Sequence, residues 1–296
     1  MGVALSKEGS FGFALQISKG SYVAPDTWLP LLDAETVSQK HNYVFFDMAD
    51  GNDFQSKYFS AGSWAEGALP LPLIPGSVSN LLSWIQDRDS DNQGEWASAL
   101  IDCGNTVKQL TDAKVRRARI VLEKGKPALC LLEVVALSLA AGTPGTPAMP
   151  VAPPYIFREA TVELETGGGG AAADANCERI EIVIDGMLEQ PAEGMRLRDA
   201  ANPLQLYNLS GVRCVGSFDR DFVDSGVYDD FLAGTESALT VTLTRDVNVC
   251  TVTLPRIVHA EDEVGLPGSA ERRLVERVNF VALGSTDGAT APVILA

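Results

Sequence analysis

The sequence predicts a mainly β protein made of two tandem β-sandwich or half-barrel units, each with one short α-helix. Three features predict this class: apolar and polar residues alternate along most of the chain, part of the first half is repeated in the second, and a Pro- and Gly-rich segment separates the halves. A chain of 296 residues is long enough for two cores. Its 46% hydrophobic residues exclude a wholly disordered protein.

Alternation with period two predicts the strands of the first unit. They are expected over 11–18, 43–48, 57–73, 115–122 and 129–137. The spacing of apolar residues over 78–84 predicts one short helix. The segment 1–10 is expected to form an N-terminal arm, and 19–39 to be irregular.

The second unit shows the same kind of pattern. Strands are expected over 158–164, 179–185, 206–223, 238–244, 248–254 and 275–283, and a helix over 227–233. In the second of these strands Ile180, Ile182 and Ile184 share one face, while Glu181 and Asp185 lie on the other. One face of the sheet is therefore expected to pack, and the other to meet water or a partner.

An internal repeat relates the two units. Residues 58–69 match residues 207–218 at a constant offset of 149, and the two helical signals follow at the same offset. Three shorter matches lie at shifted offsets: 98–100 with 237–239, 119–121 with 256–258, and 135–137 with 281–283. The segment 141–154 is predicted to be an extended linker between units at 1–140 and 155–296.

The charge argues against a protein that grips nucleic acid. The formal net charge is −16, whereas phosphate binding needs clustered Lys and Arg. Residues 1–150 carry 12 basic and 16 acidic residues, and residues 151–296 carry 11 and 23. One basic cluster, 114–119, divides its charges between two strand faces, which favours ion pairing with a neighbouring acidic subunit.

No motif predicts catalysis. The five cysteines form no CxxC pair and neither histidine has a nearby Cys, so neither a disulfide framework nor a zinc site is expected. The acid pairs Asp219 with Asp221 and Asp229 with Asp230 are interpreted as a solvated strand face and a helix N-terminus. We predict no enzymatic activity, no cofactor, no metal and no membrane segment, with synthesis in the cytoplasm.

Several segments, in a fixed order, resemble one protein family. They are Gly62-Ser-Trp-Ala-Glu-Gly67, Ile180-Glu-Ile-Val-Ile-Asp185, Ser210-Gly-Val-Arg-Cys-Val-Gly216, Tyr228-Asp-Asp-Phe-Leu232 and Val252-Thr-Leu-Pro-Arg-Ile-Val258. Together they make the chain similar to the major tail tube proteins of long-tailed (siphovirus-type) bacteriophages. The resemblance covers nearly the whole chain and depends on order and spacing.

The resemblance implies a structural virion protein located in the phage tail. Members of the family form stacked rings whose strands join into an intersubunit β-barrel, and the hollow tube conducts DNA. Two units per chain imply three chains per pseudo-hexameric ring, with six chains of a one-domain fold as the alternative. The implied partners are other copies, tail-tip and tail-terminator proteins, a tape measure protein in the lumen, and DNA in transit.

Two groups of residues are candidates for these contacts. The predicted lumen-facing acids are Glu181, Asp185, Asp219 and Asp221. The predicted inter-ring or inter-subunit residues are Lys19, Tyr22, Trp28, Gln39, Arg116, Arg117, Gly167 and Gly170. The run from Gly167 to Gly170 is interpreted as a hairpin tip, because no Lys-Ser/Thr pair follows it as in a phosphate-binding loop.

The alternative function is a carbohydrate-binding or adhesin-type β-sandwich module. Such a module needs aromatic side chains gathered on one exposed face. The four tryptophans, Trp28, Trp64, Trp84 and Trp96, are scattered along the chain, which disfavours this alternative.

Overall fold

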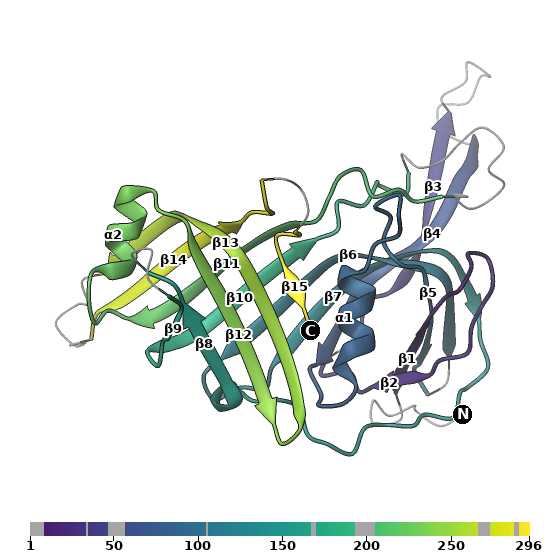
Figure 1. Cartoon of the computed structure of the whole chain (residues 1–296). Helices are drawn as coiled ribbons and strands as arrows, with labels where there is room; N and C mark the ends of the chain where they lie inside the picture. Colours follow the sequence, from purple (N-terminus) through teal and green to yellow (C-terminus); the bar gives the residue numbers. More distant parts are fainter. Residues whose placement is uncertain are drawn as a thin grey trace.

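The chain is mainly β, as predicted. The computed structural model describes residues 9–33, 35–46, 57–104, 106–166, 170–192, 205–265, 273–286 and 290–296. In these residues fifteen strands form one antiparallel sheet, accompanied by two α-helices (Figure 1). None of these helices is long and apolar enough to cross a membrane.

The first half of the sheet contains seven strands and helix α1. They are β1 (Ser10–Leu15), β2 (Thr27–Leu29), β3 (Ser38–Phe46), β4 (Lys57–Pro72), α1 (Val78–Gln86), β5 (Ala97–Asp102), β6 (Val107–Glu123) and β7 (Leu129–Ala141).

The second half contains the remaining strands, a 3-10 turn and helix α2. They are η2 (Phe157–Glu159), β8 (Ala160–Leu164), β9 (Ala172–Ala173), β10 (Cys177–Asp185), β11 (Arg213–Asp221), α2 (Gly226–Ala233), β12 (Ser237–Arg245), β13 (Asn248–Gly265), β14 (Val275–Ala282) and β15 (Ile294–Leu295).

The two halves have the same strand order. The first runs β2-β1-β5-β6-β7-β4-β3 and the second runs β9-β8-β12-β13-β14-β11-β10. In both halves the helix follows the fourth strand along the chain. Each strand from β1 to β7 thus has a counterpart from β8 to β14, and β15 is an addition that pairs with β13.

The register of the strands agrees with most of the sequence repeat. Gly67 of β4 faces Val134, and Gly216 of β11 faces Phe280, which is 146 residues further on. The paired residues thus agree with the sequence offset of 149 between β4 and β11. They also agree with the match of 135–137 with 281–283, which relates β7 to β14. The match of 119–121 with 256–258 is wrong, because the counterpart of Arg119, which faces Leu131, is Glu263, which faces Arg277. The match of 98–100 with 237–239 is one position out, because Ala97 faces Ala113 as Ser237 faces Ile257.

Strand β6 joins the two halves. Along one edge it pairs with β7, while the other edge pairs with β5 over its first part and with β10 over its second. The β6–β10 contact contains seven residue pairs, from Glu123 with Arg179 to Arg117 with Asp185. The sheet is therefore continuous across the predicted boundary between the units.

One hydrophobic core runs through both halves. Helix α1 has apolar residues at positions 78, 81, 82 and 85, which is the spacing that covers one helix face. Trp84 stacks on Phe13 with a centroid separation of 5.1 Å. The same core contains Ile180, Ile182 and Ile184, so the predicted inward face of β10 is confirmed.

The segment between the halves has neither helix nor strand after Ala141. It lies along the first half, where the amide of Gly142 donates to the carbonyl oxygen of Val107 at 2.9 Å. At Gly145 an added Cβ would clash with the Trp28 ring, so the segment packs closely.

Several element predictions need correction. The segment 19–39, predicted to be irregular, contains β2 and the start of β3. Strand β5 was missed because it lies between β1 and β6, where burial of five of its six residues removes the alternation. Strand β6 begins at Val107 and not at 115, and β11 covers Arg213–Asp221 and not all of 206–223.

The predicted hairpin around the glycine run is confirmed at its base. Strands β8 and β9 pair antiparallel on either side of it, with Leu164 opposite Ala172. Gly167 and the next two residues lie outside the described part of the chain, and Gly170 is exposed with no heavy atom near its missing side chain.

Two glycines allow the same close backbone approach in the two halves. A Cβ at Gly67 would clash with the backbone of Thr36 and Val37, and a Cβ at Gly216 would clash with the backbone oxygen of Glu181. Counted through the strand pairing, Thr36 and Glu181 are counterparts. Glycine is therefore required at both positions, because any side chain would push neighbouring strands apart.

The substitution Gly216→Ala is expected to lower the free energy of unfolding by about 1–3 kcal/mol, because the neighbouring backbone has no room to move. Thermal or urea unfolding measures this loss. The control Gly170→Ala should leave stability unchanged, since that position meets open space. Equal stability of both variants would show that the close approach at Gly216 is not a constraint.

Candidate assembly interface

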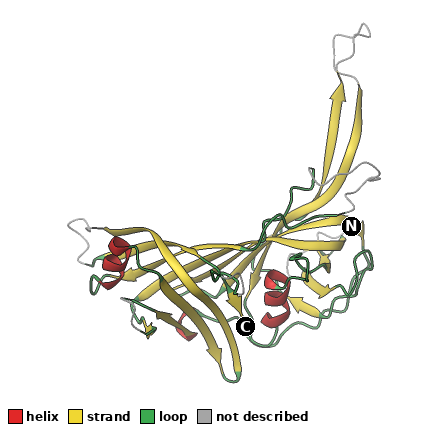
Figure 2. Cartoon of the chain, turned by 45° about the horizontal axis from the view of Figure 1, so that its top comes forward, coloured by secondary structure: helices red, strands yellow, loops and turns green. Residues whose placement is uncertain are grey.

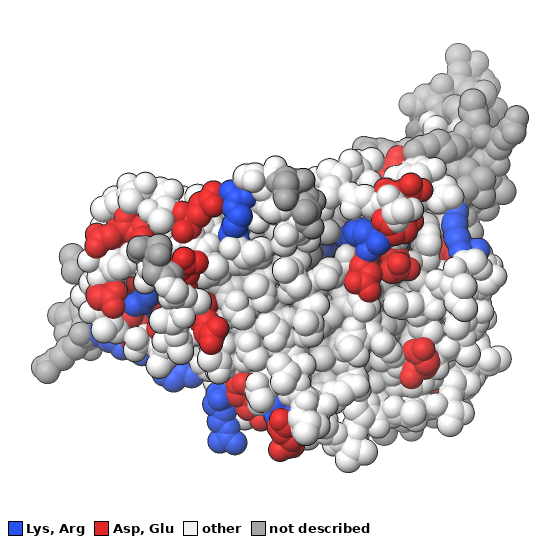
Figure 3. All heavy atoms as spheres, viewed as in Figure 1, with Lys and Arg blue, Asp and Glu red and all other residues white. Residues whose placement is uncertain are grey.

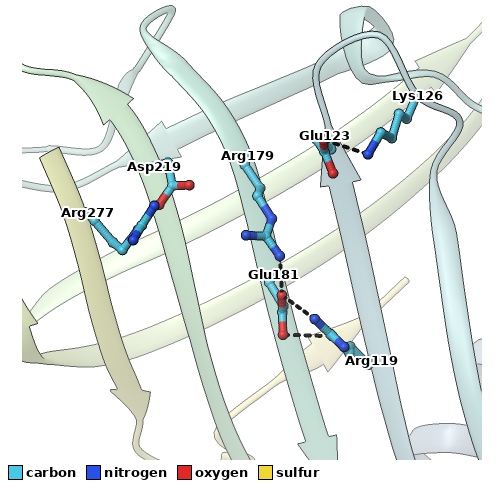
Figure 4. Close-up of polar contacts among 7 residues, drawn as sticks. All are labelled: Arg119, Glu123, Lys126, Arg179, Glu181, Asp219 and Arg277. Atoms are coloured by element: carbon cyan, nitrogen blue, oxygen red, sulfur yellow. Dashed lines mark hydrogen bonds and ion pairs between the residues drawn. The ribbon is translucent and has the colours of Figure 1, made fainter. Parts of the chain in front are cut away.

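A row of alternating charges crosses the face of the sheet opposite the buried isoleucines. Glu123 of β6, Arg179 of β10, Asp219 of β11, Arg277 of β14 and Glu263 of β13 are successive partners in the strand register. Figure 4 shows the first four of these side chains on one side of the sheet. Because cross-strand neighbours carry opposite charges, the row favours this register over its alternatives.

All four predicted lumen-facing acids lie on this face, and each has an arginine partner. Glu181 lies 2.7 Å from Arg119 and 2.8 Å from Arg179 (Figure 4). The other pairs are Asp185 with Arg117 at 3.0 Å, Asp219 with Arg277 at 3.0 Å, and Asp221 with Arg273 at 3.1 Å.

This pairing changes how the acids are interpreted. Each carboxylate is balanced by a guanidinium group, so these four residues add little net negative field to the face that carries them. The face shown in Figure 3 has acidic side chains at its left, its right and its lower margin, around a broad uncharged region. The four acids thus lie together on one face. Because each is paired with an arginine, they are not the main source of the net charge of −16.

The two predicted interface arginines pair within the chain. Arg116 lies 3.3 Å from Glu66 of β4, in the same half. Arg117 lies 3.0 Å from Asp185 and so joins β6 to β10 across the two halves. The acidic partner predicted for these arginines lies within the chain in both cases, in the first half for Arg116 and in the second half for Arg117.

The predicted contacts in 19–39 divide into buried and exposed residues. Trp28 is buried against Leu100 and Val107, so it belongs to the packing of this chain. Tyr22 is half-buried, and burial raises its pKa. Lys19 lies over the Trp96 ring at 5.5 Å. Only Gln39, on β3, is exposed and remains available to a partner.

The β3–β4 hairpin projects from the body of the protein (Figure 2). Aromatic and aliphatic side chains are exposed along it: Tyr43, Val44, Phe45, Tyr58 and Phe59. The rings of Tyr43 and Tyr58 meet edge to face with centroids 5.4 Å apart. An exposed apolar cluster of this kind marks an interaction surface.

The corresponding segments of the second half are covered by the first half. Leu188 and Leu206 are buried against Val135 and Leu137, with Trp64 and Trp96 at the margin. The Lys114 ammonium donates to the carbonyl oxygen of Leu206 at 2.9 Å and lies 4.4 Å from the centre of the Trp96 ring. Burial lowers the pKa of Lys114 to about 8. The exposed side chains of the projecting hairpin are therefore the counterparts of side chains that are buried inside the chain in the second half.

Sequence reasoning missed the residues at the free strand edges. Lys40 of β3 and Glu261 and Glu263 of β13 are exposed, and no described strand pairs with the outer edge of β3 or with that side of β13. No ion pair joins these three residues to any described residue. The sequence shows alternation along them but cannot show which edges lack a neighbour.

A buried charge cluster lies on the inner side of β11, β13 and β14. The Glu276 carboxylate is fully buried 3.3 Å from Arg220, which also lies 3.3 Å from Asp174. Burial, reinforced by the nearby Asp262 carboxyl group, raises the pKa of Glu276 to about 7. Burial likewise raises the pKa of Asp262 and lowers that of His259.

Stability should therefore depend on pH through Glu276. A raised pKa in the folded state gives stability that is present below the unfolded-state pKa and lost as pH rises through about 7. Between pH 5 and pH 8 the free energy of unfolding of the wild type should fall by about 1–3 kcal/mol relative to Glu276→Gln. Urea unfolding at both pH values, with exposed Glu163→Gln as control, tests this; parallel pH profiles would contradict it.

The described residues form no candidate metal site. They contain no group of three or more His, Cys, Asp or Glu side chains placed to hold a metal ion. All five cysteines are free, and four of them are buried. Burial raises the pKa of Cys130 to about 12, so that thiol is unreactive. His41 stacks on Tyr43 on the projecting hairpin.

Comparisons with known proteins identify no relative. No family model matches the chain. No curated protein sequence matches it either. The interpretation of the surfaces therefore depends on their geometry.

Proposed function

We propose that this protein is a structural subunit that assembles with copies of itself into a hollow tube, in the manner of the major tail tube proteins of long-tailed phages. In this proposal the chain consists of two tandem tube-like units, 1–140 and 155–296, which arose by duplication. The identical strand order of the two halves and the repeat at an offset of 149 support the duplication.

The observation that carries the proposal is the β6–β10 contact. It is an edge-to-edge joint between two units of the same strand order, and it leaves the outer edge of β3 and the second part of one edge of β13 without a described partner strand. A unit that joins its own copy edge to edge can repeat the joint with other chains. Repetition with rotation closes a ring, and a β-barrel across subunits pairs the edges of β3 and β13.

Two units per chain imply three chains in a ring of six units. Six chains per ring remains the alternative, and ring symmetry distinguishes the two. Rings that stack by a heterologous contact form a filament because that contact does not close. The partners of such a tube are tail-tip, tail-terminator and tape measure proteins, and DNA passes through without specific binding.

The balanced charge row bears on the lumen. If the face with Glu181 and Asp219 lined the channel, DNA would meet paired charges and no cluster of free cations, so the gain from counterion release would be small. The net charge of −16 keeps the tube as a whole repulsive to DNA.

Electron microscopy of the purified protein tests the proposal. Raising the protein concentration should produce rings or rods with a regular axial repeat, because a non-closing contact propagates. A monomer at all concentrations, even with a tail-tip complex as nucleator, would contradict the proposed function.

A second candidate, carbohydrate binding, is favoured by one observation. Tyr43, Phe45 and Tyr58 form an exposed aromatic cluster on the projecting hairpin, and aromatic faces of this kind can stack on sugar rings. A glycan array distinguishes the functions: specific binding that is lost in Tyr43→Ala and Tyr58→Ala would favour the carbohydrate module. The burial of the corresponding side chains of the second half, Leu188 and Leu206, favours assembly.

A further inference from the structure

The contact inside the chain supplies a template for a contact between chains. Strand β10 is the counterpart of β3, and β6 is the counterpart of β13. Strand β10 pairs with the second part of β6, beyond the end of β5. The corresponding part of β13 lies beyond the end of β12, and no described strand occupies that edge.

Shared bulges fix which residues correspond. Strand β6 has a bulge between Val115 and Arg117 against β7, and β13 has one between His259 and Glu261 against β14. Arg117 thus corresponds to Glu261. In the other pair of strands, Gln39 faces Ala65 as Ile184 faces Cys214, which makes Lys40 the counterpart of Asp185.

We propose that β3 of one copy pairs antiparallel with the free edge of β13 in a second copy, with Lys40 opposite Glu261. Inside the chain, Asp185 is directly opposite Arg117 and lies 3.0 Å from it. Between copies the same position carries Lys40 and Glu261, so the ion pair is kept with its charges exchanged. The inference rests on the proposed function, because it names the partner surface by which copies join within a ring.

The neighbouring positions are complementary in the same register. Gln39 falls opposite Asp262, both of whose carboxylate oxygens are shielded from solvent and whose hydrogen-bonding neighbour is the Glu276 carboxyl group. The side-chain amide of Gln39 supplies a donor on that face. Ser38 falls opposite Glu263, the residue that ends the charge row, and Lys40 is diagonal to it.

In this arrangement the projecting hairpin also contacts a surface of the second copy. Leu188 and Leu206 cover Val135 and Leu137 inside the chain. The residues that correspond to Val135 and Leu137 are Val281 and Leu283. The exposed cluster on the β3–β4 hairpin is therefore carried over the outer side of β13 and β14 in the next copy, which removes it from water.

Oxidative cross-linking tests the register directly. In a Cys103→Ser background, Ser38→Cys with Glu263→Cys, and separately Gln39→Cys with Asp262→Cys, place thiols directly opposite each other. Opposite pairs in an antiparallel ladder alternate between two spacings, so at least one variant should form disulfides between copies, seen as dimers and trimers on a non-reducing gel. The control Ser38→Cys with Glu261→Cys is two positions out of register. The absence of cross-links in both variants, or equal cross-linking in the control, overturns the proposal.

Charge exchange tests the ion pair. Lys40→Glu and Glu261→Lys should each raise the concentration for half-assembly at least about tenfold, because like charges then face each other. The double variant, which restores opposite charges, should recover assembly. Glu163→Lys reverses an exposed charge away from both edges and should assemble as the wild type does. Single variants that assemble as the wild type does, or a double variant that assembles no better than the single variants, would overturn the pairing. Thermal unfolding, which should be unchanged in all variants, checks that they fold.

The two proposals can fail separately. Rods that form without the predicted cross-links would leave the tube function intact and reject the β3–β13 contact. If the cysteine variants cross-link in the predicted register but the wild type never forms rings or rods, the contact is supported and the tube function is rejected.

Discussion

The hydrogen-bonding edge of β6 is the constraint on which the rest of the structure depends. Strand β6 has 17 residues and β5 has six, so a large part of one edge of β6 extends beyond its neighbour. Unpaired backbone groups at such an edge need a partner, and β10 supplies it. This contact places the whole second half of the sheet. Strand β13, with 18 residues against nine in β12, repeats the same mismatch without a strand to fill it.

Charge selects the register that backbone pairing alone leaves open. The row from Glu123 to Glu263 crosses five strands with alternating sign, and Arg117 with Asp185 adds a pair at the junction of the halves. Partly exposed pairs of this kind contribute little stability one by one. A slip of one position would bring their side chains to the apolar face, so together they discriminate strongly between registers. Their balance also shows that acidic composition and an acidic surface patch are different properties.

Sequence alone predicted the fold class, two helices and most strands, because period-two alternation survives wherever one sheet face is buried. It missed β5, which is buried on both faces, and it placed Trp28 at an interface although that side chain fills the core beside Leu100. The repeat was found where glycine is required, at Gly67 and Gly216, and misaligned at 119–121, for which the strand pairing gives 263–265 as the counterpart. Lys40 and Glu261 carried no signal, because a free edge is a property of the sheet and not of the strand.

Copies of this chain are proposed to join by repeating the contact that its own halves make. Image averages of the assembled protein, at a resolution that separates strands, should show rings of three chains in which six similar units form one closed barrel. In these rings β3 of each chain should be hydrogen-bonded to β13 of the next. A ring or rod in which the outer edge of β3 remains open to solvent would contradict this contact.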